Sequence, residues 1–147
     1  MSMSRNAMSQ ITAIMPVRNG YNLLSLSLPP LLAMQDRGEL VEVIVVDDAS
    51  TDNSYEMVKE KFPDFLLLKN EHNSGPTSSR NIGARAAIGK YIIFLDNDVL
   101  VKRDTFEKLV GFMENTSDAG LCGAKFKPEN EEKMWWNMGY DLNIFRD

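Results

Sequence analysis

The chain has 147 residues, 44% of them apolar and 25% charged, which is typical of one globular domain with a single core. Its net charge of −5 and the lack of a basic stripe argue against nucleic acid as a ligand. No apolar run approaches the roughly 20 residues of a membrane-spanning helix, and the single Cys122 excludes an internal disulfide. We therefore expect a cytoplasmic protein, either free or at the cytoplasmic face of a membrane.

Short apolar runs alternate with amphipathic segments from Ile11 onward. This alternation predicts an α/β domain over residues 11–126, with a mostly parallel central sheet and helices on both faces. The predicted strands are Ile11–Met15, Val41–Val46, Phe65–Leu68, Tyr91–Leu95 and Gly120–Phe126. The second and fourth of these are almost wholly apolar, which predicts central strands covered on both faces. Residues 1–10 have no periodicity, and we interpret them as an expression-vector remnant or a disordered segment.

The segments between these strands have the 3.6-residue spacing of amphipathic helices. The predicted helices are Tyr21–Gln35, Tyr55–Phe62, Thr77–Ile88 and Phe106–Met113. Pro29 and Pro30 should kink the first helix or divide it into two. Residues 127–147 lack a clear period, and we expect this tail to be the start of a truncated acceptor region. Its pair Trp135-Trp136 would be costly to expose, which leaves packing on another segment or self-association open.

Polar residues gather where three of the predicted strands end. They are Pro16-Val17-Arg18-Asn19, Asp47-Asp48 and Asp96-Asn97-Asp98. The carboxyl ends of parallel strands share one edge of an open sheet, and ligands bind there. One Asp in such a place could instead cap the following helix, as we expect of Asp52. Two acidic clusters at one edge are harder to explain by capping, so the sequence predicts a binding site.

Asp96 and Asp98 stand two residues apart directly after an apolar strand. This spacing suits a hard divalent cation that keeps several waters and takes further ligands from substrate phosphates. Only Asp104 follows nearby, which is too little for a calcium site built from protein ligands alone. The predicted cofactor is therefore Mg²⁺ or Mn²⁺. An isolated D-x-D pattern is common by chance, and its place after a buried strand makes it more specific.

The stretch from Asn73 to Gly83 leads from a loop into a helix. Its helix start offers free backbone N–H groups, and Arg80 lies about one turn into the helix, where it could meet an anion. Taken alone, Arg80 could be a surface residue, but beside the acidic clusters we interpret it as part of the site. His72 is the only histidine, so no histidine-based catalytic or metal constellation can be assembled.

Four motifs in this order resemble the family 2 glycosyltransferases of the GT-A fold. They are Ile14–Asn19, Val43–Asp52, Asn73–Gly83 and Phe94–Asp98. The resemblance covers about residues 11–115 and implies a Rossmann-like, nucleotide-sugar-binding half of a glycosyltransferase. Such an enzyme takes a sugar from a donor such as a UDP-, GDP- or TDP-sugar and transfers it to an acceptor hydroxyl, with inversion at the anomeric carbon. The acceptor, a glycan or a lipid-linked sugar, is not specified by these motifs.

The resemblance also implies roles for single residues. Those implied to bind substrate are Pro16, Val17, Arg18, Asn19, Asp47, Asp48, Gly75, Arg80, Asp96 and Asn97. Within this set, the loop after the first strand and Asp48 would frame the base and ribose, and Asp47 would support the turn. Arg80 would lie near the base or diphosphate. Asp96 would contact the ribose or a metal-bound water. Asp96 and Asp98 would thus serve the cation, with Asp98 as its direct ligand.

The sequence departs from the family pattern in three ways. Pro29-Pro30 interrupts a helix that is usually continuous. Arg18-Asn19-Gly20 stands where an aromatic residue first and an acidic residue third are common. The acidic general base of the family has no counterpart among the late carboxylates Glu129, Glu131, Glu132 and Asp141. We therefore expect the general base to lie beyond the end of this chain.

Two other readings remain open at this stage. Tyr91–Leu100 also looks like the motif of haloacid dehalogenase phosphatases, with Asp96 as nucleophile and Asp98 as general acid, although that motif normally opens its domain. A non-enzymatic receiver domain would use Asp47-Asp48 with Asp96 to hold magnesium, but it needs a later strand that ends in lysine. Neither the G-x-G-x-x-G nor the P-loop pattern is present.

Overall fold

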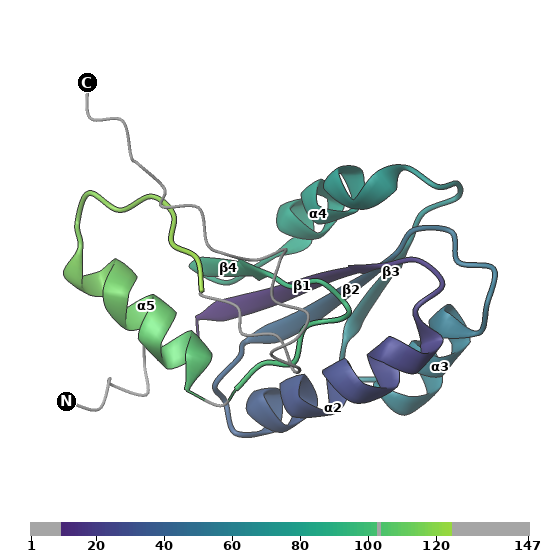
Figure 1. Ribbon diagram of the computed structural model, residues 1–147, viewed down its shortest axis with the longest axis horizontal. Helices are drawn as coiled ribbons and strands as arrows, with labels where there is room; N and C mark the ends of the chain where they lie inside the picture. Colours follow the sequence, from purple (N-terminus) through teal and green to yellow (C-terminus); the bar gives the residue numbers. More distant parts are fainter. Residues whose placement is uncertain (1–9, 103, 125–147) are drawn as a thin grey trace, which may run out of the picture.

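A computed structural model of the protein describes residues 10–102 and 104–124. Helices and strands alternate along this part of the chain, with labels as in Figure 1. In order they are β1 (Ile11–Val17), α2 (Tyr21–Asp36), β2 (Glu42–Asp47), α3 (Ser54–Lys61), β3 (Leu66–Lys69), α4 (Gly75–Ala86), β4 (Tyr91–Phe94) and α5 (Thr105–Asn115). The predicted α/β class is confirmed. The predictions for the amino-terminal remnant and for the tail with Trp135-Trp136 lie outside the described residues.

The four strands form one parallel sheet in the order β3-β2-β1-β4. In its register Ile14 of β1 pairs with Ile44 of β2 on one side and with Phe94 of β4 on the other. From β1 the chain first adds strands on one side and then returns to add β4 on the opposite side. The strand order therefore reverses between β1 and β4, and in open parallel sheets a ligand crevice forms at the carboxyl ends of the strands at such a point.

Helices cover both faces of the sheet, as predicted. Figure 1 shows α4 on one face and α2, α3 and α5 on the other. Successive strand side chains point to opposite faces, so Met15 and Val43 join the cluster under α2, α3 and α5, whereas Ile14 and Ile44 join the cluster under α4. Both clusters anchor the central strands, which fixes where their carboxyl ends lie.

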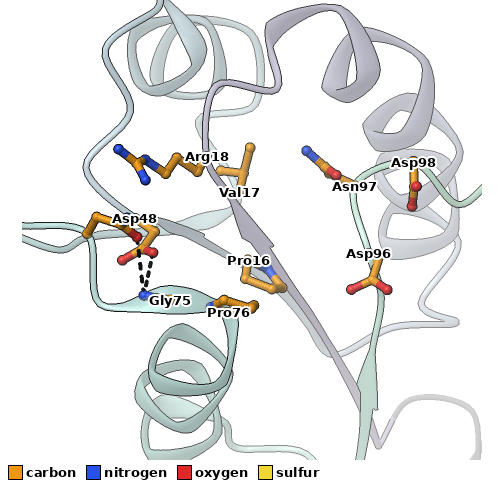
Figure 2. Close-up of a pocket in the computed structure, with 10 residues that line it drawn as sticks. Pro16, Val17, Arg18, Asp48, Gly75, Pro76, Asp96, Asn97 and Asp98 are labelled. Carbon is orange, nitrogen blue, oxygen red and sulfur yellow. Dashed lines mark hydrogen bonds between the residues drawn. The ribbon is translucent and has the colours of Figure 1, made fainter.

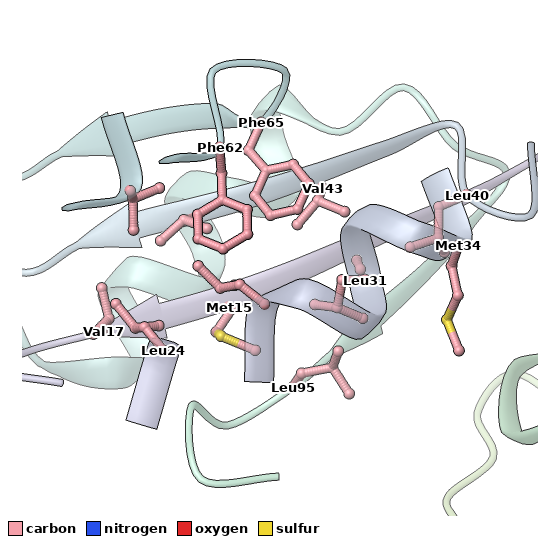
Figure 3. Close-up of a cluster of buried hydrophobic side chains, with 14 of the residues drawn as sticks. Met15, Val17, Leu24, Leu31, Met34, Leu40, Val43, Phe62, Phe65 and Leu95 are labelled. Carbon is pink, nitrogen blue, oxygen red and sulfur yellow. The ribbon is translucent and has the colours of Figure 1, made fainter. Parts of the chain in front are cut away.

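The larger cluster holds most of the apolar core (Figure 3). Leu24 and Leu31 of α2 are completely buried there, and the rings of Phe62 and Phe65 stack with their centroids 5.2 Å apart. Full burial of an aliphatic or aromatic side chain contributes about 1.5–3 kcal/mol. This layer therefore holds α2 and α3 firmly against the sheet below the site.

Two strand predictions are wrong. The strand β4 lies at the edge of the described sheet, not at its centre, and its Ile92 and Phe94 are 39% and 47% exposed. An apolar run therefore does not by itself determine the place of a strand in the sheet, which depends on the crossovers between strands. Residues 120–124 form no strand, and Leu121 is 69% exposed. Two glycines in this stretch leave few side chains to support pairing, and Lys125 and Phe126 lie outside the described residues.

The sequence predicts either a kink or two helices at Pro29 and Pro30. The helix α2 runs through both prolines without interruption, so the division into two helices is wrong. Proline removes the N–H groups that would bond to the carbonyls of Ser25 and Leu26. Both of these residues are exposed, so water can bond to the two carbonyls. Leu28 and Leu31 on either side are completely buried and hold the helix on the sheet.

A cluster of hydrogen bonds holds together the amino-terminal edge of the sheet, which is the edge opposite the crevice. The Thr12 hydroxyl donates to Glu42 Oε1 at 2.7 Å and accepts from the Gly89 N–H at 2.9 Å. The Ile88 N–H donates to the same Glu42 oxygen at 2.6 Å. These hydrogen bonds join β1, β2 and the loop before β4 at the end of the sheet far from the crevice.

Gly83 lets α4 approach the sheet closely. A Cβ atom at this position would lie 2.5 Å from Cγ2 of Ile14 and 3.3 Å from Cγ2 of Val46. Ile14 is completely buried, so it has little room to move away. The glycine therefore allows the contact between α4 and the two central strands.

We expect Gly83→Ala to lower the free energy of unfolding by about 1–2 kcal/mol, because overpacking outweighs the gain of about 1 kcal/mol in helix propensity. Urea denaturation measures the change. Asn81→Ala, at an exposed position of the same helix, is the control and should raise stability by several tenths of a kcal/mol. Equal stabilisation by both alanines would contradict close packing at Gly83.

Candidate functional site

A cavity of about 540 Å³ lies at the carboxyl-terminal edge of the sheet. Figure 2 shows Asp48 and Arg18 on one side of it, Asp96 and Asp98 on the other side, and Pro16 between them. The lining residues are Pro16, Val17, Arg18, Asp48, Asn73, Gly75, Pro76, Asp96, Asn97 and Asp98. The two acidic clusters that the sequence places far apart therefore share one cavity.

Three of the predicted site residues do not line the cavity. Asp47 is completely buried and its Oδ2 accepts a 3.2 Å hydrogen bond from the Ser50 N–H, which places it in the turn after β2. The side chain of Asn19 is turned away and accepts from the Thr51 N–H at 2.7 Å. Arg80 reaches the site only through an ion pair with Asp96.

Asp48 holds the loop after β3 in place. Its Oδ1 accepts from the Ser74 N–H at 2.8 Å and from Asn70 Nδ2 at 2.7 Å, and its Oδ2 accepts from the Gly75 N–H at 2.8 Å. The carboxylate thus satisfies N–H groups at the start of α4, which have no partners within the helix. A negative charge is also favourable at this end of a helix.

The same contacts keep Asp48 ionised. Burial alone would raise the pKa of its carboxyl, since only 4% of the residue is exposed. The hydrogen bonds from Ser74, Asn70 and Gly75 outweigh burial and lower the pKa below its ordinary value. Asp48 therefore carries a fixed negative charge at the edge of the cavity.

Asn70 is a site residue that the sequence analysis missed. It follows β3 directly and is 8% exposed, and its Nδ2 bridges Asp48 Oδ1 and the Ser79 hydroxyl, at 2.7 and 3.1 Å. A polar residue at a strand end was the signal that identified the other clusters. Applied to β3, the same rule predicts Asn70.

The two carboxylates of the D-x-D motif are in different situations. Arg80 Nη2 donates to Asp96 Oδ1, and the two side chains are 32% and 60% exposed. An ion pair as exposed as this contributes at most about 1 kcal/mol, so it can exchange for another partner. The carboxylate of Asp98 accepts no hydrogen bond and forms no ion pair with any other residue that the structure describes.

The carboxylates at this end fit a cation that shares its ligands with a substrate. Among residues 10–102 and 104–124, no three His, Cys, Asp or Glu side chains gather closely enough to enclose a metal ion. Asp96 and Asp98 could supply one or two oxygens, which is the way Mg²⁺ is usually held when substrate phosphates complete its shell. The donor set therefore fits the predicted cation.

Gly20 brings the loop after β1 against the loop after β4. A Cβ atom at Gly20 would collide with Asn97 Nδ2 and would lie 2.7 Å from Cγ2 of Val17. The lack of a side chain at Gly20 thus makes room for the side chain of Asn97 at the cavity. The loops that follow β1 and β4 are consequently in contact beside the D-x-D motif.

Comparison with known proteins identifies the family. Glycosyl transferase family 2 matches residues 12–146, and the chain belongs to this family. The resemblance read from the four motifs and the GT-A fold that it implied are confirmed. The phosphatase and receiver interpretations gain no support. Asp96 follows the last strand along the described chain, whereas the phosphatase motif would follow the first strand. Among the described residues, no helix is long and apolar enough to cross a membrane.

Similar proteins share the domain and continue well beyond it. An uncharacterized glycosyltransferase of Haemophilus influenzae is 37% identical over 109 residues, which are 72% of this chain and 43% of the relative. The mannosyltransferase PcManGT from Pyrobaculum calidifontis, solved with GDP-Man and Mn2+, is 31% identical with a TM-score of 0.63, over 71% of this chain and 32% of that chain. S. aureus TarS 1-349, solved with UDP-GlcNAc, is 27% identical with a TM-score of 0.62, over 81% of this chain and 38% of that chain. The chain thus spans less than half of these proteins.

The low pKa of Asp48 predicts a pH-dependent contribution to stability. We expect Asp48→Asn to lower the free energy of unfolding by about 1–3 kcal/mol near neutral pH, because an amide N–H₂ then faces backbone N–H donors. A carboxyl with a depressed pKa stabilises the fold above its unfolded-state pKa and loses that effect as the pH falls through the folded value. The difference between the two proteins should therefore shrink in acid.

Urea denaturation at about pH 7 and about pH 3 checks this expectation. Asp98→Asn is the control, because the Asp98 carboxylate has no partner among the described residues. It should change stability little at either pH. A constant difference between Asp48→Asn and the unchanged chain at both pH values would show that the charge of Asp48 does not support the fold.

Proposed function

We propose that this chain is the donor-binding part of a glycosyltransferase that holds a nucleoside diphosphate sugar together with a divalent cation. The observation that carries the proposal is the cavity that joins Asp48 and Arg18 at one end to Asp96 and Asp98 at the other. A nucleoside diphosphate has an uncharged, hydrogen-bonding end and a strongly anionic end. At one end of the cavity Arg18 and Asp48 offer hydrogen-bond donors and acceptors, and at the other end Asp96 and Asp98 could hold a cation beside the diphosphate.

The nucleoside would bind at the end formed by Arg18 and Asp48. Asp48 already accepts three hydrogen bonds, which leaves one of the roughly four acceptor positions of a carboxylate for a ligand N–H or O–H. The Arg18 guanidinium forms no ion pair with another described residue and points toward this side of the cavity (Figure 2). Together they offer an acceptor and several donors, as the edge of a base or a ribose requires.

The diphosphate would bind toward Asp98. Without a cation the diphosphate would be repelled by Asp96 and Asp98, so the carboxylates require a positive charge between them and the phosphates. Asp98 would hold the cation directly, and Asp96, paired with Arg80, would stand beside it. The bound cation would supply Lewis-acid stabilisation of the charge that collects on the leaving diphosphate. That the similar mannosyltransferase PcManGT was solved with GDP-Man and Mn2+ supports a nucleotide sugar and a divalent cation as the ligands.

The chemistry would be a displacement at the anomeric carbon. The acceptor oxygen forms a bond to this carbon as the bond to the diphosphate oxygen breaks, and inversion follows if the attack comes from the opposite face. The described residues hold the donor and stabilise the leaving group. We assign the general base and the acceptor site to parts of the protein outside the described residues, and the enzyme to the cytoplasm or the cytoplasmic face of a membrane.

Calorimetric titration of the 147-residue chain tests the proposal. UDP, GDP and TDP, with and without Mn²⁺, are the ligands. We expect one of them to bind, and to bind at least tenfold more tightly with Mn²⁺, because the cation offsets the repulsion by Asp96 and Asp98. Asp98→Asn should abolish the enhancement by Mn²⁺ and leave weaker, cation-independent binding in place.

Asp64→Asn is the matched control, since Asp64 is also exposed and lies before β3, at the opposite edge of the sheet. It should leave both affinities unchanged. Absence of heat with every nucleotide would refute donor binding by this chain. An enhancement by Mn²⁺ that persists in Asp98→Asn would refute the role of Asp98 while leaving donor binding intact.

A further inference from the structure

A set of hydrogen bonds clamps the loop after β1 to the loop after β2 beside the cavity. The Gly20 N–H donates to the Ser54 hydroxyl at 2.9 Å, and the Tyr21 N–H donates to Asp52 Oδ2 at 3.2 Å. In the other direction, the Thr51 N–H donates to Asn19 Oδ1 at 2.7 Å. We name the residues Asn19–Tyr21 and Ser50–Ser54 the bracket. It joins the starts of α2 and α3.

The bracket replaces ordinary helix capping. Neither Gly20, before α2, nor Asn53, before α3, forms a side-chain cap. Instead, side chains at the start of α3 accept from N–H groups at the start of α2, which would otherwise lack partners. The Ser54 hydroxyl in turn donates to Asp52 Oδ1. Two helix N-termini, both electropositive, are therefore held together by one carboxylate.

Backbone conformation makes the bracket necessary. Asn19 and Ala49 have φ angles of 52° and 55°, in the left-handed region that residues with a side chain rarely adopt. Each follows a residue of the cavity, Arg18 in one loop and Asp48 in the other. The chain thus turns sharply directly after both residues, and such a conformation lasts only where the surroundings hold it.

None of the bracket residues lines the cavity. Their effect on a ligand must therefore pass through neighbours: Arg18 in sequence, Asp48 through Ala49, and Asn97, whose side chain lies against Gly20. These three neighbours come from three different loops around the cavity. A shift of Gly20 would consequently disturb both the nucleoside end and the D-x-D end.

We propose that Ser54 and Asp52 are positioning residues for donor binding, because the bracket that they close sets the distance between Arg18, Asp48 and Asn97. This inference rests on the proposed function. The bracket orders the loops before the nucleotide arrives, so less conformational freedom is lost when it binds. Opening the bracket should therefore weaken binding even though no contact to the nucleotide is removed.

The structure offers a matched pair of variants. Ser54 and Thr12 are both completely buried, and each hydroxyl donates to a carboxylate and accepts from a glycine N–H. Ser54 lies at the cavity edge and Thr12 at the opposite edge of the sheet. Ser54→Ala and Thr12→Val thus remove the same kinds of hydrogen bond at the two ends of the domain.

We expect Ser54→Ala to weaken binding of the preferred nucleoside diphosphate with Mn²⁺ by at least tenfold, and Thr12→Val to keep the affinity within about twofold, a free-energy difference of about 0.4 kcal/mol. The urea midpoints of both variants should fall to a similar degree. Without nucleotide, the amide NMR resonances of Arg18 and Gly75 should shift or broaden in Ser54→Ala and stay in place in Thr12→Val. These measurements separate positioning from a loss of stability.

Equal affinities in Ser54→Ala and Thr12→Val would overturn the positioning role, while tight binding by the unchanged chain would still uphold donor binding. Absence of binding by the unchanged chain would overturn both proposals. If Ser54→Ala shows no cooperative unfolding, Asn19→Gly serves in its place, because glycine accepts the positive φ and the variant loses only the hydrogen bonds that Thr51 donates to Asn19 Oδ1. It should weaken binding at least fivefold, and an unchanged affinity would overturn the bracket role.

Discussion

Parallel strands impose one constraint on this domain: every loop that leaves the sheet toward a following helix does so at the same edge. Helix starts crowd together there, each with N–H groups that have no partner within the helix. Asp48 and Asp52 satisfy such groups at the starts of α4 and α2, and Asp47 accepts from the Ser50 N–H in the turn after β2. The acidic character of the edge is thus in part a structural necessity of the fold.

This division of the carboxylates separates scaffold from chemistry. Asp48 accepts three hydrogen bonds that hold the loop before α4. The Asp98 carboxylate accepts none from other described residues. Arg80 neutralises Asp96 in an exposed pair that costs little to exchange. The carboxylate oxygens that are free to bind a ligand therefore lie at the D-x-D end, where a cation and a diphosphate would bind. The carboxylate oxygens at the nucleoside end mostly hold the loops in place.

Much of the fold and of the site could be predicted from the sequence, because apolar runs mark strands and polar residues at their ends mark the edge. Asp48 and Asp98 share a cavity, as the motifs implied. The place of β4 in the sheet and the exposed faces of Ile92 and Phe94 depend on the crossovers, which leave no local pattern. The direction of Asn19, away from the cavity and toward Thr51, depends on a positive φ that the sequence does not specify.

The bracket changes what the second motif of the family pattern means for this chain. In Asp47-Asp48-Ala49-Ser50-Thr51-Asp52, Asp48 alone lines the cavity. Asp47 holds the turn, and the later residues hold the neighbouring loop. A run of polar residues beside a ligand site need not contact the ligand, because loops without regular structure have few other ways to become rigid. Their rigidity matters most at Arg18, whose long side chain loses much freedom on binding and gains from a backbone that is already fixed.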